Sequence, residues 1–444
     1  MKQMFAGCLA AMVTLAAPAA PTGQVKFTEY TLKNGLRVQL SEDRTTPVVA
    51  IHVTYDVGSR NERAGRTGFA HLFEHMMFKG SANVGDGEHF YQILTQGGSM
   101  NGTTSSDRTV YFETLPAHQI ELGLFLEADR MRSLAITQEN LDNQRNAVQE
   151  ERRQSLDNQP YGKAFERHQQ LMYDNFAYKH SVIGSMEDLN AATVEDVNEF
   201  FKTYYAPNNA VLTLVGDFKS AAALKLIKKY FEAIPQQPAP PAVDIKEAPQ
   251  TAERRDSMDD PLARLSRVYV GYKAVPGNTH DYFALEVLAA VLQDGQSSRL
   301  YKSLVQEKQL SVGAGAFIVE QRAVGPFYLI ATVIPGKKPE DVEAAMYAEI
   351  ERIQREPIAE WELTKAVNGA RTSYFSGIRS SQSRAAALGI NKVFYNDANV
   401  LNTYVEQMKA VTRADVQRVA RQYLQPTNRT VLTVVAKGGT AASR

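Results

Sequence analysis

Five consecutive residues, His71-Leu72-Phe73-Glu74-His75, place two imidazoles and one carboxylate in a segment that is otherwise apolar. In a helix, residues four apart lie on one face with Cβ atoms about 5–6 Å apart, so His71 and His75 can bind the same metal ion. Glu74 flanks that ion without having to bind it, which suits a general base for a water activated by the metal. The spacing therefore predicts a zinc hydrolase site.

The helix that carries these residues should be interior, because its neighbours between residues 69 and 78 are apolar nearly all round. Unpaired ionisable groups are costly there, and a bound metal satisfies all three. Thr67 is the predicted N-cap and Gly80 the predicted stop. The alternative is a structural helix with two core histidines and a stray acid.

A catalytic zinc usually has three protein ligands, so the two histidines need a third from elsewhere. Residues 144–153 are typical of a helix that follows the N-cap-like Thr137. Glu151 lies three residues beyond Val148 and so shares its inward face. Glu150 points about 100° away, and we expect it to be solvated.

The order His-x-x-Glu-His is the inverzincin signature, and its surroundings extend the likeness. The chain resembles the pitrilysin/insulinase-type metallopeptidases over nearly all of its mature length, through residues 58–80, 97–104, 158–162 and 205–209. In that family the third ligand is a glutamate some 76 residues after the second histidine, and Glu151 is 76 residues after His75 (151 minus 75). The resemblance thus favours Glu151 over Glu150.

The resemblance implies a zinc endopeptidase with one Zn²⁺ per chain, a catalytic Glu74 and a peptide substrate. It also implies α+β domains, each an antiparallel sheet backed by helices, that assemble as a clamshell dimer. The substrate would add a strand to the sheet edge at residues 98–104. The predicted substrate contacts there are Gly98, Ser99, Asn101 and Thr103; without the resemblance, the alternative for Asn101 is an ordinary turn residue.

Two positions depart from the family pattern. Many members have a further glutamate seven residues before the ligand glutamate, where this chain has Gln144. Self-sufficient members also have an arginine and, seven residues later, a tyrosine, where this chain has Val305 and Val312. This implies a metal-bearing subunit whose homologous partner supplies the arginine and tyrosine. A homodimer active alone, or a non-catalytic peptide-binding scaffold, are the alternatives.

The composition fits a large enzyme. The 444 residues are 44% hydrophobic, enough for proper cores, and 49 basic side chains balance 49 acidic ones. Nothing in this balance indicates nucleic acid or an anionic membrane surface as a partner.

Residues 1–20 are typical of a secretory signal peptide, with Lys2 ahead of a short apolar run. The run is short for a spanning helix, so we expect no stable membrane anchor, a retained anchor being the alternative. Cys8 is the only cysteine and would leave with the signal. A mature chain without thiols suits a bacterial periplasmic or secreted protein.

Periodicity predicts alternating blocks of strands and helices. The expected strands are a hairpin over 30–40 and strands at 48–55, 97–104 and 109–115, and the expected helices cover 118–134 and 138–155. Residues 235–259 begin with a Pro-rich run and are predicted to be a linker.

The two sides of this linker are related. The pattern from Thr193 to Val215 recurs from Thr412 to Val435, at an offset of 219 (412 minus 193) that slips to 220 (431 minus 211). We infer an old duplication into a metal-bearing domain, 21–234, and a homologous domain, 260–444. The second copy has no His-x-x-Glu-His, and Glu286–Ala290 takes its place.

Overall fold

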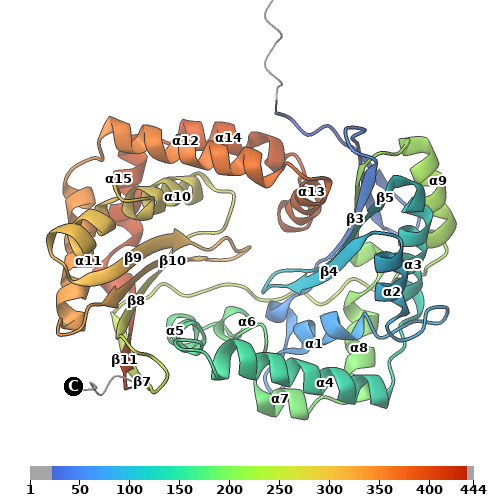
Figure 1. The fold of residues 1–444 in the computed structure, drawn as a ribbon, viewed down its shortest axis with the longest axis horizontal. Coiled ribbons are helices and arrows are strands. Elements are labelled where there is room, and N and C mark those ends of the chain that lie inside the picture. The colour runs from blue at the N-terminus through green and yellow to red at the C-terminus, as the bar shows by residue number, and fades with distance from the viewer. Residues whose placement is uncertain (1–22, 438–444) are drawn as a thin grey trace, which may run out of the picture.

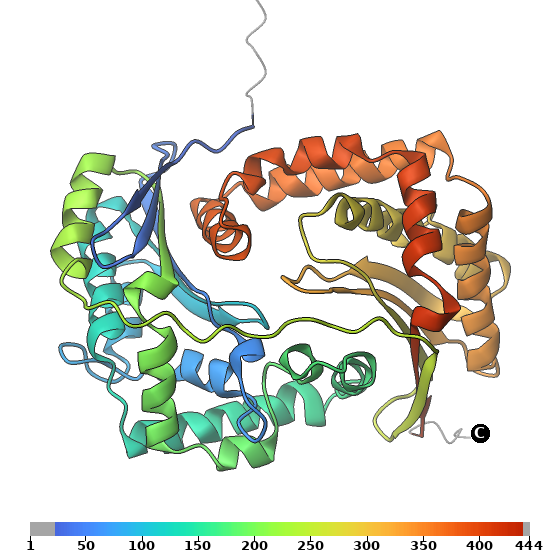
Figure 2. The ribbon, with the colours of Figure 1, turned by 180° about the vertical axis from the view of Figure 1, so that it is seen from behind.

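The computed structural model describes residues 23–437, which form an α+β fold with two sheets and many helices (Figures 1 and 2). The predicted signal peptide and Cys8 lie outside these residues. Within them, no helix is both long enough and apolar enough to cross a membrane.

The first sheet has the strand order β1-β2-β6-β3-β5-β4. Its strands are β1 (Thr28–Thr31), β2 (Arg37–Glu42), β3 (Val48–Tyr55), β4 (Ser99–Thr104), β5 (Thr109–Pro116) and β6 (Ala210–Gly216). The predicted hairpin and the predicted pair β4 and β5 are confirmed. The expectation of a purely antiparallel sheet is wrong, because β6 inserts between β2 and β3, antiparallel to β3 but parallel to β2.

The second sheet has the order β7-β11-β8-β10-β9. Its strands are β7 (Arg254–Asp260), β8 (Arg267–Lys273), β9 (Ser311–Ile318), β10 (Pro326–Val333) and β11 (Arg429–Ala436). Here too one pair, β7 with β11, is parallel. Strand β7 lies within the predicted linker, so the irregular connection covers only 235–253. An edge strand made almost wholly of charged and polar residues does not have the apolar alternation that marks a strand.

Some helices of the first half pack on the outer face of the first sheet, and the others lie below that sheet in the view of Figure 1. They are α1 (Phe69–Met76), α2 (Glu88–Thr95), α3 (Ile120–Ser133), α4 (Gln138–Arg152), α5 (Ala164–Met172), α6 (Phe176–Lys179), α7 (Met186–Asn190), α8 (Val194–Tyr204) and α9 (Ser220–Phe231). The helices predicted at 118–134 and 138–155 are α3 and α4, each with irregular helical turns at one end.

The second half contributes six helices among the described residues. They are α10 (His280–Gln293), α11 (Pro339–Arg355), α12 (Glu360–Gly377), α13 (Ser381–Tyr395), α14 (Val400–Ala410) and α15 (Arg413–Tyr423). The turn expected to replace the metal motif lies within α10.

The halves exchange helices across the sheets (Figure 2). Helix α13 of the second half packs against β3 and β6 of the first sheet. It approaches so closely that a Cβ on Gly389 would lie 2.7 Å from Thr54 Oγ1. Helix α5 of the first half packs in return against β8 and β11, where His168 Nε2 lies 3.0 Å from the Thr430 carbonyl oxygen. Each sheet is therefore covered on one face by a helix of the other half.

Two helix starts that correspond in the inferred duplication are capped in the same way. Thr193 and Asp196 cap α8 reciprocally, and Thr412 and Asp415 cap α15 in the same way. Partial burial of the Asp415 carboxyl disfavours its charged form and by itself would raise its pKa. Hydrogen bonds from Thr412, with His280 and Arg418 alongside, still hold the pKa of Asp415 at about 2.

We expect Asp415→Asn to lower the free energy of unfolding by about 1 kcal/mol at pH 7, because it removes a negative charge from the first turn of α15, where the helix dipole favours one. Because the folded pKa lies below the ordinary 3.8, this contribution is present above pH 4 and is lost as the pH falls toward 2. Urea denaturation of the unsubstituted protein and of Asp415→Asn from pH 7 to pH 3 should show the difference in their free energies of unfolding becoming smaller below pH 4. A difference that stays constant over that range would contradict this assignment.

Candidate metal centre

Helix α1 begins by a different capping arrangement from the predicted one. Its N-cap is Gly68, with φ of 86°, and the Thr67 hydroxyl bonds to Asp188 instead. The buried Glu62 carboxylate accepts the N–H groups of Gly68 (2.9 Å) and Ala70 (2.8 Å). A carboxylate at a helix N-terminus satisfies the free donors and complements the helix dipole. Sequence reasoning missed Glu62 because it lies six residues before the N-cap, outside the range of local capping patterns.

The C-terminal end is closer to expectation. The α-helix ends at Met76, and tight turns continue as Phe78 N–H bonds to His75 and Lys79 N–H to Met76. Gly80 then adopts φ of 94°, which turns the chain away.

The structure brings the three predicted ligands together. His71 and His75 on α1 face Glu151 on α4, with Nε2 to Oε2 distances of 3.7 and 3.3 Å. Ligand atoms about 2.0–2.2 Å from a tetrahedral zinc lie roughly 3.3–3.6 Å from one another. The two imidazoles and one carboxylate therefore fit a zinc ion. The Glu151 side chain is 45% exposed, so the group is open to a substrate.

Electrostatics tie these groups to one another. The His75 ring holds the pKa of the Glu151 carboxyl below its usual range. Burial lowers the pKa of His75, but Glu151 outweighs burial, with a smaller share from Gln144, and the net shift is upward. Burial and the neighbouring His75 lower the pKa of His71 to about 4. The predicted Gln144 thus lies at the His75 ring, and His71 is neutral, as a metal ligand must be.

Glu74 is held beside this group rather than in it. Its side chain is buried, and burial raises the pKa of its carboxyl. The Thr104 hydroxyl donates to Glu74 Oε2 at 2.5 Å. A Cβ on Gly102 would lie 3.0 Å from Glu74 Cγ and Oε1, so a larger residue there would push the carboxylate away from its place against the strand. Both residues belong to β4, which therefore orients Glu74.

Strand β4 is an edge strand of the first sheet. The predicted contacts Ser99, Asn101 and Thr103 are exposed on one face of β4, while Gly102 and Thr104 face Glu74. The predicted contact Gly98 precedes the strand and packs against Leu115. Asn101 Oδ1 accepts the N–H of Gly102 at 2.9 Å, and Arg108 bonds to the Thr103 carbonyl at 2.8 Å. The prediction missed Gly102 and Thr104, although strand alternation alone would have put them on a shared face.

The residues excluded by the sequence analysis have other neighbours. Glu150 is exposed and accepts hydrogen bonds from Arg153 (3.1 Å) and Gln154 (3.0 Å). Val305 lies half-buried in the helical turns at 301–307, and Val312 lies on β9 with 54% of its surface exposed.

A second acidic group lies buried within the first half. His89, Glu113 and Glu127 bring three possible ligand atoms within 4.8 Å of one another. Arg130 bonds to both carboxylate oxygens of Glu127, and burial raises the pKa of Glu113 well above its ordinary value. Burial thus favours the protonated form of Glu113, and Arg130 pairs with the Glu127 carboxylate. All of these side chains are closed to a substrate.

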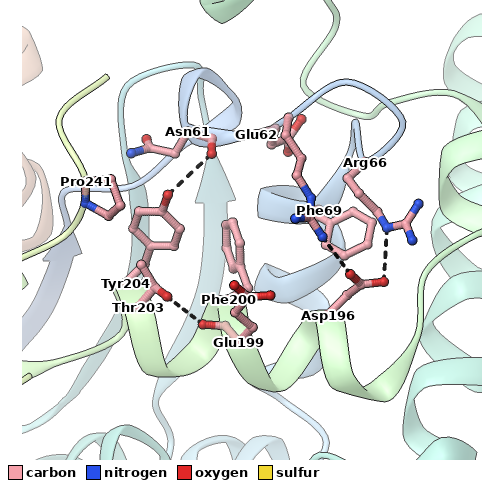
Figure 3. A pocket seen from close by; sticks show the side chains of 11 residues that line it. Asn61, Glu62, Arg66, Phe69, Asp196, Glu199, Phe200, Thr203, Tyr204 and Pro241 are labelled. Atoms are coloured by element: carbon pink, nitrogen blue, oxygen red, sulfur yellow. Dashed lines mark hydrogen bonds and ion pairs between the residues drawn. The ribbon is translucent and has the colours of Figure 1, made fainter. Parts of the chain in front are cut away.

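A cavity of about 170 Å³ lies beside the start of α1 (Figure 3). Phe69, Phe200 and Tyr204 line it, and Asp196 bonds to Arg66 Nε at 3.0 Å at its rim. None of the three ligand residues lines this cavity, so it is separate from the metal centre.

Comparisons with known proteins agree over most of the chain. The family profile described as "Insulinase (Peptidase family M16)" matches residues 37–185, and "Peptidase M16 inactive domain" matches residues 191–370. The chain is 33% identical to "Zinc protease PqqE" of Helicobacter pylori, over 92% of each chain. It is 22% identical to "Probable mitochondrial-processing peptidase subunit beta" of Arabidopsis thaliana, over 89% of this chain and 75% of that one. A crystal structure of a protease from Helicobacter pylori superposes with a TM-score of 0.88 at 32% identity, covering 92% of this chain and 99% of the other.

We expect Glu151→Gln to weaken zinc binding by at least about 100-fold, because even loss of a group that supports a ligand costs about 10–100-fold. Glu150→Gln is the matched control, since it removes the neighbouring carboxylate, which is exposed and bound elsewhere. Competition with a chromogenic chelator measures both affinities. Equal zinc affinity in the two variants would exclude Glu151 as a ligand.

Proposed function

The chain belongs to the insulinase (peptidase M16) family, and on this premise we propose that it is a zinc-dependent endopeptidase that cuts peptides or unfolded protein segments. The observation that carries the proposal is the meeting of His71, His75 and Glu151 beside a buried Glu74. One Zn²⁺ per chain at these ligands would lower the pKa of a water and polarise the scissile carbonyl.

The residues of the chain then have defined tasks. Glu74 takes the proton of the attacking water and returns it to the leaving amine. Thr104 and Gly102 fix the direction of its carboxylate. The free edge of β4 offers unpaired backbone groups to an extended peptide, which would lie directly beside Glu74. Affinity would come mainly from the peptide backbone, so cleavage should tolerate many side chains.

We further propose that the chain is the metal-bearing subunit of a heteromer. Val305 and Val312 can provide neither a cation nor a hydroxyl donor to the developing oxyanion. A homologous subunit with the arginine and tyrosine would complete the site. The relative named as a subunit supports this reading. A homodimer active alone is the alternative, whereas the intact His71, Glu74, His75 and Glu151 disfavour a scaffold.

We also propose that the enzyme works in the periplasm or outside the cell. This rests on the signal-like residues 1–20 and on the absence of cysteine from the rest of the sequence. A chain without thiols is not affected by an oxidising compartment.

Glu74→Gln should reduce kcat for a quenched fluorescent peptide by about 10²–10⁴-fold, the usual contribution of a general base. The amide keeps the shape and can still accept the Thr104 hydrogen bond, so bound zinc should stay at one ion per chain. Elemental analysis of the purified variant checks the zinc, and Glu150→Gln is the control for kcat. A variant with full zinc and full activity would refute the assignment of Glu74.

The zinc-loaded chain should cleave peptides poorly alone and well when a homologous chain with the arginine and tyrosine is co-expressed. Activity only in the mixture, lost when this chain has Glu74→Gln, would establish the heteromer. Equal activity alone would show that the valines are tolerated and would favour the homodimer. No activity in either case, with zinc bound, would contradict the peptidase proposal itself.

A further inference from the structure

The two edge hairpins of the molecule meet at their tips. Strands β5 and β4 end one side of the first sheet, and β10 and β9 end the corresponding side of the second. The turn at 105–108 joins β4 to β5, and the loop at 319–325 joins β9 to β10. Both views show these hairpins pointing toward each other between the halves (Figures 1 and 2). The half without metal ligands therefore reaches the strand that orients Glu74.

Asp107, at the tip of the first hairpin, is the centre of the contact and is only 2% exposed. It accepts hydrogen bonds from Arg60 Nη1 (2.7 Å), from the Tyr178 hydroxyl (2.6 Å) and from the backbone N–H of Arg322 (3.1 Å). The Arg322 guanidinium bonds to Asp56 Oδ1 at 2.5 Å, and Arg60 bonds to the same oxygen at 2.6 Å. Two arginines and two aspartates thus balance in charge. Arg322 is the second half's part in this network.

The tip is connected to the general base by a short path. Thr104, which bonds to Glu74, is the last residue of β4 and lies three residues before Asp107. The N–H groups of Ser59 and Arg60 bond to the carbonyls of Ser105 (3.2 Å) and Ser106 (3.0 Å) and hold the turn from below. A displacement of the end of β4 would draw Asp107 away from these donors, and a buried carboxylate that loses its donors is costly.

We propose that Arg322 is a positioning residue for peptide hydrolysis: through Asp56 and Arg60 its guanidinium holds Asp107, and with it the end of β4 and the Thr104 hydroxyl that orients Glu74. This inference rests on the proposed peptidase function. It gives the half described as inactive a share in catalysis. The Arg322 contact is not needed to hold the two halves together, because α5 and α13 already pack across them.

The first test uses the zinc-loaded full chain with its partner, if the partner is needed. Arg322→Ala should lower kcat about 10-fold with KM within about twofold, well inside the ~10²-fold loss that a 1 Å misplacement can cause. Arg322→Lys should recover part of kcat, because its ammonium can still bond to Asp56. Arg264→Ala, at an exposed arginine of the same half, is the control. Zinc content and melting temperature should stay near those of the unsubstituted protein.

A double variant separates positioning from a general structural effect. Thr104→Val removes the hydroxyl from Glu74, so Arg322→Ala added to it should lower kcat no further. The proposal would be overturned if kcat of the double variant fell by the product of the two single losses. It would also be overturned if Arg322→Ala left kcat unchanged.

Hydrogen exchange provides a readout that needs no activity. Arg322→Ala should speed amide exchange at least about fivefold in peptides that cover 99–108, and Arg264→Ala should not. Unchanged exchange there would overturn the proposal even if kcat fell. If the unsubstituted chain cleaves no peptide, the proposed function fails, and the exchange rates still decide whether Arg322 fixes β4.

Discussion

The crossing of α1 with α4 is the contact on which the functional part of the molecule depends. It brings imidazoles from one helix to a carboxylate from another, and it is held by apolar side chains rather than by the polar groups themselves. Leu72 and Phe73 of α1 and Val148 of α4 are fully or almost fully buried in one cluster with the first sheet. Dense packing of this kind fixes side chains to within fractions of an ångström, as a metal site requires.

The local parts of this arrangement were accessible from sequence. Helical spacing alone places His71 and His75 on one face, and the predicted strand 48–55 has the same bounds as β3, although β3 is buried on both faces rather than alternately. Glu151 came from the inward stripe of its helix together with the family spacing. These inferences work because they depend on neighbours in the chain.

The parts that sequence could not predict depend on distant contacts. Glu62 caps α1 only because the intervening turn folds back on the helix, and Thr104 reaches Glu74 only after β4 has paired with β5. The parallel pairing of β6 with β2 joins strands separated by most of the first half. Strand β7 is defined by its partner β11 rather than by its own residues. No local periodicity contains this information.

Because α13 belongs to the second half, one face of the first sheet stays uncovered until late in the synthesis of the chain. The first sheet is complete in the chain at Gly216, but the helix that covers its second face ends at Tyr395, 179 residues later (395 minus 216). At roughly 5–20 residues per second, synthesis of that interval takes about 10–35 s. During that time the apolar face around Ala50 and Val215, which Ala385 and Leu388 later cover, has no partner. The first half therefore cannot bury this face by itself, and the second half completes its fold.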